Sequence, residues 1–345
     1  GAVVIVGHKG KIVYRKAFGN RSLVPNVEPM TIDTIFDVAS LTKPIATATS
    51  IMILVEQGKL RLNDTIGMYI PDIDDENAKR VTLLQLLTHV SGYRPDFDLG
   101  EKWTGREGML AALKKEKLRQ TPGTRFVYSD INFEILGEII YLVSKKRLED
   151  LVDEWFAEMK MSDSRFNSFK PTEAPASEYF RIDNISNATL SRIAPTENIR
   201  GQNSYLGSKF EGDDKEGDRI LRGQVHDPTA FRMGGVAGHA GLFSTADDIA
   251  RYAQMMINGG VVPDETGGNL SGSEGVSGRR NGTLPTGRVS ASSGKRILSA
   301  ATVLVQSRRI FAAGVIRPHR FYRNVRLDRS GVGNILCVHV QSRSP

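Results

Sequence analysis

Residues 37–60 read DVASLTKPIATATSIMILVEQGKL, a short polar lead followed by a long run of small and apolar residues. The run predicts a helix from about Ser40 to Gln57, and Gly58 ends it because glycine readily adopts the left-handed conformation found just past a helix. Ser40 and Lys43 are three residues apart, so their side chains share one face of this helix and the amine can reach the hydroxyl. The segment therefore places candidate chemistry at the start of a central helix.

A serine next to a lysine predicts a nucleophile with its base. A serine hydroxyl is a weak nucleophile at neutral pH and needs an adjacent group that takes its proton. A helix N-terminus favours a developing oxyanion and disfavours a protonated lysine, and the N–H of the serine can donate to that oxyanion. The alternative for Ser40 alone is a simple N-cap. A second Ser-x-x-Lys, Ser292 to Lys295, lies in a Gly/Ser-rich stretch and is interpreted as chance.

A second group of candidate residues lies at residues 121–130, TPGTRFVYSD, where Tyr128 and Asp130 directly precede a predicted helix, INFEILGEIIYLVSKK. A phenol beside an ammonium group loses its proton more readily and can relay a proton to and from a serine. The alternative for Tyr128 is a half-buried tyrosine bonded to the backbone. Asp130 would place a carboxylate near Lys43, which stabilises the protonated amine and shifts the duty of base toward Tyr128.

The charge of the chain is divided very unevenly. The 345 residues have a formal charge of +7, but residues 279–345 contain 13 of the 46 basic residues and one of the 39 acidic residues. This tail lacks helical periodicity and interleaved aromatic residues, so we predict no nucleic-acid binding. Cys337 is the only cysteine, which excludes a disulfide framework and a multi-cysteine metal site. No apolar run of 18 residues predicts a transmembrane helix.

Four motifs in order give the chain a family resemblance. SLTK at 40–43, LLTHVSGY at 86–93, PGTRFVYSD at 122–130 and GGVAGHAGLFSTADDIARYA at 234–253 together resemble the class C β-lactamase-related serine hydrolases. That family includes β-lactamases, penicillin-binding carboxypeptidases and esterases. The resemblance covers roughly residues 1–260.

The resemblance implies roles for individual residues. Ser40 resembles the acylated nucleophile, Lys43 the lysine that activates it, and Tyr128 the tyrosine that shuttles the proton. Asp130 takes the substrate-binding position that is more often an asparagine. His89 resembles a packed core histidine. The resemblance implies no metal and no organic cofactor.

The implied fold is α+β and β-lactamase/transpeptidase-like. An antiparallel sheet seeded by a hairpin at 2–19 is flanked by helices, and a mainly helical region covers about 60–240. We expect a hydrolase domain over 1–262, a flexible Gly/Ser-rich insertion at 263–296 and a divergent basic tail at 297–345. A helix is predicted from Ser244, where a capping box begins, and residues 171–225 read as irregular.

The C-terminal part lacks an expected motif. The family resemblance implies a Lys-Thr-Gly or His-x-Gly triplet on a late strand, and the only literal match, His239-Ala240-Gly241, fits an earlier segment of the family. The C-terminal strands are therefore expected to be incomplete, with one strand at 334–340 and an unpaired edge on the N-terminal hairpin.

These features predict a serine hydrolase that acts through an acyl-enzyme on an ester, amide or β-lactam carbonyl. The alternative is an impaired or non-catalytic family member, either a binding or scaffold protein or a truncated product. A first residue other than Met suggests a missing N-terminal piece, and the family favours an exported or periplasmic location. No oligomeric state is predicted.

Overall fold

The computed structural model describes residues 1–169, 185–199, 220–263, 294–296, 325–328 and 335–341. Most of the predicted insertion at 263–296 and of the predicted tail at 297–345 lies outside the described residues, including Ser292.

The main sheet joins the two ends of the chain. Its four strands follow the order β12-β13-β1-β2, and all neighbours are antiparallel. They are β1 (Ala2–His8), β2 (Lys11–Phe18), β12 (Val325–Asp328) and β13 (Ile335–Gln341). Their arrangement confirms the predicted hairpin and the predicted late strand. The expected free edge of the hairpin at β1 is wrong, because β13 pairs with β1 along its whole length.

Shorter strands form four smaller sheets within the described residues. β9 lies between β5 and β6, and separate pairs join β3 with β4, β7 with β8, and β10 with β11. Their bounds are β3 (Asn20–Ser22), β4 (Glu28–Pro29), β5 (Phe36–Asp37), β6 (Arg165–Phe166), β7 (Glu197–Asn198), β8 (Ile220–Leu221), β9 (Leu242–Ser244), β10 (Val261–Pro263) and β11 (Gly294–Arg296).

The central helix has the predicted extent but three kinds of turn. A 3₁₀ turn (Ala39–Leu41) leads into a π-helical stretch (Lys43–Ala48) and then into α1 (Thr49–Glu56). π-Helical turns are rare and are frequently found at functional sites. The other helices are α2 (Ile66–Tyr69), α3 (Glu76–Lys79), α4 (Leu83–Leu87), α5 (Gly105–Lys115), α6 (Asp130–Ser144), α7 (Leu148–Glu158), α8 (Asn187–Arg192), α9 (Pro228–Arg232) and α10 (Ala246–Ile257).

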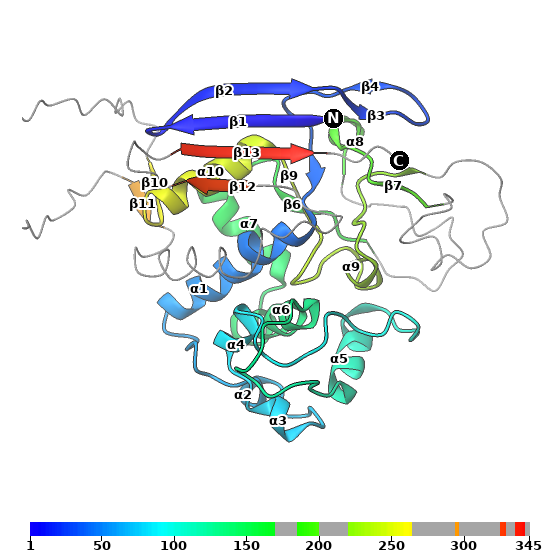
Figure 1. The fold of residues 1–345 in the computed structure, drawn as a ribbon, viewed down its shortest axis with the longest axis vertical. Helices are drawn as coiled ribbons and strands as arrows, with labels where there is room; N and C mark the ends of the chain where they lie inside the picture. Colours follow the sequence, from blue (N-terminus) through cyan, green and yellow to red (C-terminus); the bar gives the residue numbers. More distant parts are fainter. Residues whose placement is uncertain (170–184, 200–219, 264–293, 297–324, 329–334, 342–345) are drawn as a thin grey trace, which may run out of the picture.

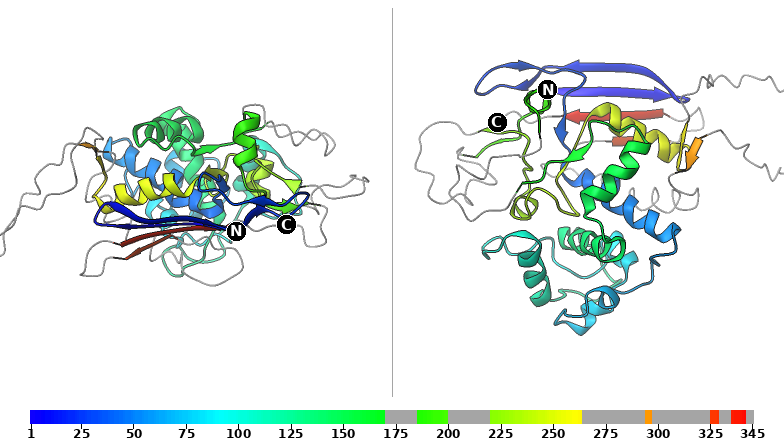
Figure 2. Two further views of the ribbon diagram at one scale, coloured as in Figure 1. Left: turned by 90° about the horizontal axis from the view of Figure 1, so that it is seen from above. Right: turned by 180° about the vertical axis from the view of Figure 1, so that it is seen from behind.

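The helices and the sheet are arranged in layers. α10 lies along the main sheet against β1 and β13, and α1 lies farther from the sheet, next to α6 (Figures 1 and 2). Figure 1 shows α2 to α6 gathered at the end of the molecule away from β1 and β2, and these helices fall within the first part of the predicted range 60–240. β1 turns alternate residues into the core, where Val3 and Ile5 are fully buried.

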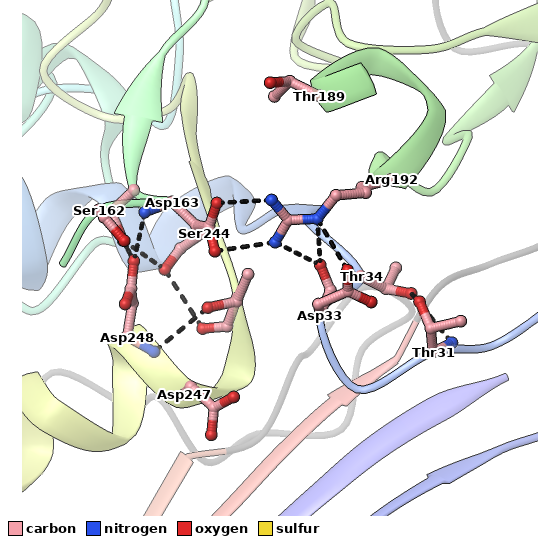
Figure 3. A network of polar contacts seen from close by, with 12 residues as sticks. Thr31, Asp33, Thr34, Ser162, Asp163, Thr189, Arg192, Ser244, Asp247 and Asp248 are labelled. Atoms are coloured by element: carbon pink, nitrogen blue, oxygen red, sulfur yellow. Dashed lines mark hydrogen bonds and ion pairs between the residues drawn. The ribbon is translucent and has the colours of Figure 1, made fainter. Parts of the chain in front are cut away.

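Arg192 joins the end of α8 to residues next to the small sheet, which consists of β5, β9 and β6. Its guanidinium donates to both carboxylate oxygens of Asp163 at 2.8 Å and contacts Asp33 at 3.0 Å (Figure 3). Asp163 directly precedes Ser164, whose hydroxyl lies 2.7 Å from that of Ser244 in β9. These contacts fasten α8 to the strands that support the central helix.

Two local predictions need correction. The helix predicted from Ser244 begins at Ala246, because the Thr245 hydroxyl accepts the Asp248 N–H as N-cap while Ser244 still pairs in β9. The stretch 171–225 is not wholly irregular, since its described residues include α8, β7 and β8. None of the helices in the described part of the chain combines the length and the hydropathy needed to span a bilayer.

Candidate active site

Ser40 lies on an exposed turn directly after β5. Ala39 before it has a positive φ of 48°, a left-handed conformation that costs a residue with a Cβ about 1–2 kcal/mol. Asp37 Oδ1 stabilises this turn by accepting the Ala39 N–H at 2.8 Å. The Thr42 hydroxyl donates to Ala39 O at 2.6 Å and accepts the Leu242 N–H of β9 at 3.1 Å. The serine is therefore presented by a turn that is fixed on two sides.

Lys43 is 2% exposed and sits one turn behind Ser40. Its Nζ lies 3.2 Å from Ser40 Oγ, 2.6 Å from Asp130 Oδ1 and 3.2 Å from the main-chain oxygen of His239. An ammonium group has three N–H donors, so these three acceptors satisfy all of them. The structure thus brings Ser40 and Lys43 of the central helix together with Asp130, which comes from a separate segment.

The charge state of Lys43 follows from competing effects. Burial lowers the pKa of its amine, but the charge of Asp130, with a further contribution from Tyr128, outweighs burial and holds the pKa above its ordinary value. Lys43 is therefore an ammonium at neutral pH. Such a group orients the Ser40 hydroxyl but does not readily take its proton, which is the consequence expected from an aspartate at position 130.

Tyr128 completes the predicted group. Lys43 Nζ lies 4.7 Å from the centroid of the Tyr128 ring. The His89 ring stacks on the Tyr128 ring, with 4.5 Å between their centroids. A cation at this distance from an aromatic ring is attracted to it. The tyrosine and the serine thus both lie within reach of the same ammonium group.

His89 is a packed histidine, as its sequence context indicated. It is 2% exposed, and its Nδ1 accepts the Ser129 N–H at 3.0 Å. Burial, together with the nearby charge of Lys43, lowers its pKa to about 3, so the imidazole is neutral at physiological pH. Because Nδ1 already accepts a main-chain donor, His89 positions the segment of Tyr128 and is not a free base.

Asp130 begins α6, with Ser129 as the preceding N-cap residue. The Asp130 N–H donates to Pro95 O at 2.6 Å, and the Ser129 hydroxyl donates to Arg94 O at 2.6 Å. A carboxylate in the first turn of a helix is favoured by the helix dipole. Its side chain is 21% exposed, so it remains partly open to solvent while it pairs with Lys43.

A second layer of charge behind Lys43 was not predicted from the sequence. The fully buried imidazole of His239 contacts Glu134 Oε1 through Nδ1 and Asp227 Oδ1, at 2.7 Å, through Nε2. Burial lowers the pKa of His239, but the charges of Asp227 and Glu134 raise it well above its usual value overall. The only signal in the sequence was a glutamate, Glu134, among the apolar residues of a predicted helix.

Asp96 lies near this layer and has a perturbed carboxyl group. Its oxygens accept the Thr229 hydroxyl at 3.1 and 3.2 Å and the Phe97 N–H at 2.7 Å. Burial raises the pKa of Asp96 to about 7, assisted by the charges of Asp130 and Asp227 and opposed by that of His239. The carboxyl therefore titrates near neutral pH.

Ligand atoms of Asp130, Asp227 and His239 lie within 4.8 Å of one another, a grouping that could hold a metal ion. Asp130 is paired with Lys43, and Asp227 is paired with His239. The two carboxylates of this group are thus already paired with cations of the chain, Lys43 and His239.

The Lys-Thr-Gly triplet is absent from the sequence. Among the described C-terminal strands, neither β11, β12 nor β13 carries a His-x-Gly triplet. His239-Ala240-Gly241 is a false match, because its histidine is buried and the triplet leads into β9 of the small sheet.

Comparison with known proteins identifies the family. The model of the Beta-lactamase family matches residues 1–294, and the chain therefore belongs to that family, as its motifs predicted. A relative from Escherichia coli K12 named as a D-alanyl-D-alanine carboxypeptidase is 32% identical over 281 residues, covering 74% of this chain and 59% of the relative. The N-acetylmuramyl-L-alanine amidase of Bacillus subtilis 168 is 31% identical over 286 residues, covering 75% and 59%. The chain thus spans less than two thirds of the length of these relatives.

Solved structures show the fold. A class C β-lactamase aligns with a TM-score of 0.55 and 22% identity over 75% of this chain and 60% of the other. A class C β-lactamase in complex with cefoxitin aligns with the same TM-score, identity and coverage. The predicted α+β, β-lactamase/transpeptidase-like fold is confirmed.

Proposed function

We propose that this chain is a serine hydrolase that cleaves an ester, amide or β-lactam carbonyl through an acyl-enzyme on Ser40. The observation that carries the proposal is the position of the buried Lys43 Nζ, 3.2 Å from an exposed Ser40 Oγ and 4.7 Å from the Tyr128 ring. A simple N-cap serine would need neither a buried ammonium group nor a tyrosine beside it.

The first half-reaction forms the acyl-enzyme. Ser40 Oγ attacks the carbonyl carbon, and its proton passes to Tyr128, which reacts as the phenolate, since Lys43 already holds its own proton firmly. The Ser40 N–H is in the first turn of the helix, where no intrahelical carbonyl accepts it, and we assign it to the oxyanion. Tyr128 then returns the proton to the leaving group as the carbonyl–heteroatom bond breaks.

The second half-reaction releases the acid product. Water attacks the acyl carbonyl and gives its proton to Tyr128, and the bond to Ser40 Oγ breaks as Oγ takes that proton back. Asp130 keeps Lys43 in place throughout and borders the cleft where substrate binds. No step requires a metal or an organic cofactor.

The substrate class is supported by the names of relatives. One relative is named as a D-alanyl-D-alanine carboxypeptidase and another as an N-acetylmuramyl-L-alanine amidase, and both names describe cleavage at an amide carbonyl. We therefore place amides and strained lactams ahead of simple esters.

The test is intact-protein mass spectrometry after incubation with a fluorophosphonate and, separately, with a fluorescent penicillin. We expect one adduct per chain that maps to Ser40, absent in Ser40→Ala. Ser292→Ala is the matched control, because Ser292 begins the other Ser-x-x-Lys tetrad, and it should label like the unaltered protein. A folded protein that forms no adduct with either probe contradicts the proposal.

The second candidate is a non-catalytic family member that binds a ligand in the same cleft. Two observations favour it: Asp130 holds Lys43 in its protonated form, and the sequence lacks the Lys-Thr-Gly strand motif. Losing one oxyanion donor typically slows such a reaction by about 10²–10³. Cooperative thermal melting without any Ser40 adduct would favour this candidate over a truncated product.

A further inference from the structure

The main-chain carbonyl that holds Lys43 belongs to a segment pressed against α6. A Cβ built on Gly238 would lie 1.8 Å from Phe133 O, so the segment and the helix touch backbone to backbone. The Thr47 hydroxyl donates to Gly238 O at 2.6 Å, and Lys43 donates to His239 O at 3.2 Å. Two successive carbonyls thus accept donors from two successive turns of the central helix.

The side chain of His239 is fixed at both ring nitrogens. Nδ1 contacts Glu134 of α6, and Nε2 contacts Asp227, which also caps α9 by accepting the Ala230 N–H at 2.9 Å. The side chains of His239 and Glu134 are buried and that of Asp227 is 21% exposed, and ions removed from water are costly unless they are paired. The imidazole therefore cannot turn without leaving a buried carboxylate unpaired, and its own backbone carbonyl is held with it.

α6 reaches Lys43 by two routes. Asp130 and Glu134 lie four residues apart on this helix, so they share one face. Asp130 contacts the Lys43 ammonium directly, whereas Glu134 contacts the histidine whose carbonyl accepts from the same ammonium. One helix face therefore sets the lysine both through a charge and through a carbonyl.

We infer that His239 is a positioning residue, whose imidazole, clamped between Glu134 and Asp227, fixes the carbonyl that directs Lys43 toward Ser40. This inference rests on the proposed function for its consequence in catalysis, but the placement of Lys43 can be measured without catalysis. The charged groups that act on the imidazole are Glu134 and Asp130 of α6, Asp227 at the N-cap of α9, and Asp96.

The experiment compares two substitutions of Glu134 with a control on the same helix. Glu134→Gln keeps an oxygen that accepts the Nδ1 proton, whereas Glu134→Met removes it at similar volume and leaves His239 paired with Asp227. Glu138→Met is the matched control, because Glu138 is also a buried carboxylate of α6 with one cationic partner, Arg106, and has no contact with Lys43 or His239 among the described residues.

Two readouts are made on each folded protein. The first is competitive acetylation of Lys43 relative to the exposed Lys9, followed by peptide mass spectrometry. The second is the rate of Ser40 labelling by a fluorescent penicillin, separated into the affinity for the probe and the rate of covalent acylation. We expect Glu134→Met to raise Lys43 acetylation at least threefold and to slow the covalent acylation of Ser40 at least tenfold. In Glu134→Gln and Glu138→Met both quantities should stay within twofold of the parent protein.

The inference is overturned if Glu134→Met and Glu138→Met change both readouts equally, or if Glu134→Gln is as impaired as Glu134→Met. If the unaltered chain forms no Ser40 adduct, the proposed function fails, and Lys43 acetylation alone decides the positioning role. If Glu134→Met does not fold, Asp227→Asn replaces it, because the amide still caps α9 but weakens the pair with Nε2. It should raise Lys43 acetylation in the same direction.

Discussion

Asp130→Asn should change the pH at which Lys43 loses its proton. Two unit charges 2.6 Å apart attract each other by about 6 kcal/mol at an effective dielectric constant of about 20. The Asp130 side chain is 21% exposed, so water weakens this attraction, and half of it leaves about 3 kcal/mol. Since one pKa unit corresponds to about 1.4 kcal/mol, the substitution should lower the pKa of Lys43 by roughly two units.

Burial of Lys43 opposes its protonation in the parent protein and in the variant alike. Burial is the largest influence on the Lys43 pKa and lowers it, and only the neighbouring charges reverse its effect. In the variant, Lys43 should therefore begin to lose its proton at the alkaline end of the assay range, about two pH units below the parent protein. A neutral amine can take the Ser40 proton, so a rising limb should appear in the pH profile that the parent protein lacks.

The assay is the second-order rate of Ser40 acylation by a fluorescent penicillin between pH 5 and 10, measured on folded protein. Asp96→Asn is the control, because it removes a carboxylate of the same neighbourhood that does not contact Lys43. The shape of the profile is compared, since the Asp130 side chain is partly exposed next to Lys43 and its loss can change probe affinity. A variant profile that superimposes on that of the parent would refute the reasoning.

Further predictions concern stability. Burial raises the pKa of Asp96 to about 7, so the folded state binds a proton more tightly than the unfolded state, and stability should fall as pH rises from about 4 to 7. Asp96→Asn should remove that fall in thermal melts at a series of pH values, and an unchanged pH dependence would contradict the assignment. Gly238→Ala should lower the free energy of unfolding by about 3 kcal/mol or more, because its Cβ would meet Phe133 O at 1.8 Å. Gly58→Ala should cost only about 1 kcal/mol, since its φ is +71° and nothing lies within 4 Å, and equal losses in urea unfolding would argue against the close approach.

The sequence predicted those parts of the molecule that depend on local pattern. Alternating β-rich runs around a Lys-Gly turn gave the hairpin, and the Ser-x-x-Lys segment gave the central helix and two members of the site. Tyr128 and Asp130 were predicted from their place before a helix and from the family resemblance. Each of these features is expressed within a few residues of sequence.

What the sequence did not predict depends on contacts between distant segments. His239, Asp227 and Glu134 are 12 and 93 residues apart along the chain, and nothing in their local patterns indicates that they meet. The strands β5, β6 and β9 are two or three residues long, too short to show an alternating pattern. The pairing of β1 with β13 was missed for a different reason. Both strands are long enough to recognise, but which strands pair is decided by contacts between distant segments.

The partnership of β1 with β13 has a consequence for biosynthesis. Val3 pairs with Val340, so β1 gains this neighbour only after all the residues between the two strands have been made. At about 5–20 residues per second, the ribosome needs roughly 15–70 s to reach that point. Throughout this interval the hairpin offers one open row of backbone donors and acceptors, and such an edge is a template for pairing with other chains. Successful maturation therefore depends on how nascent chains are kept apart before β13 is made.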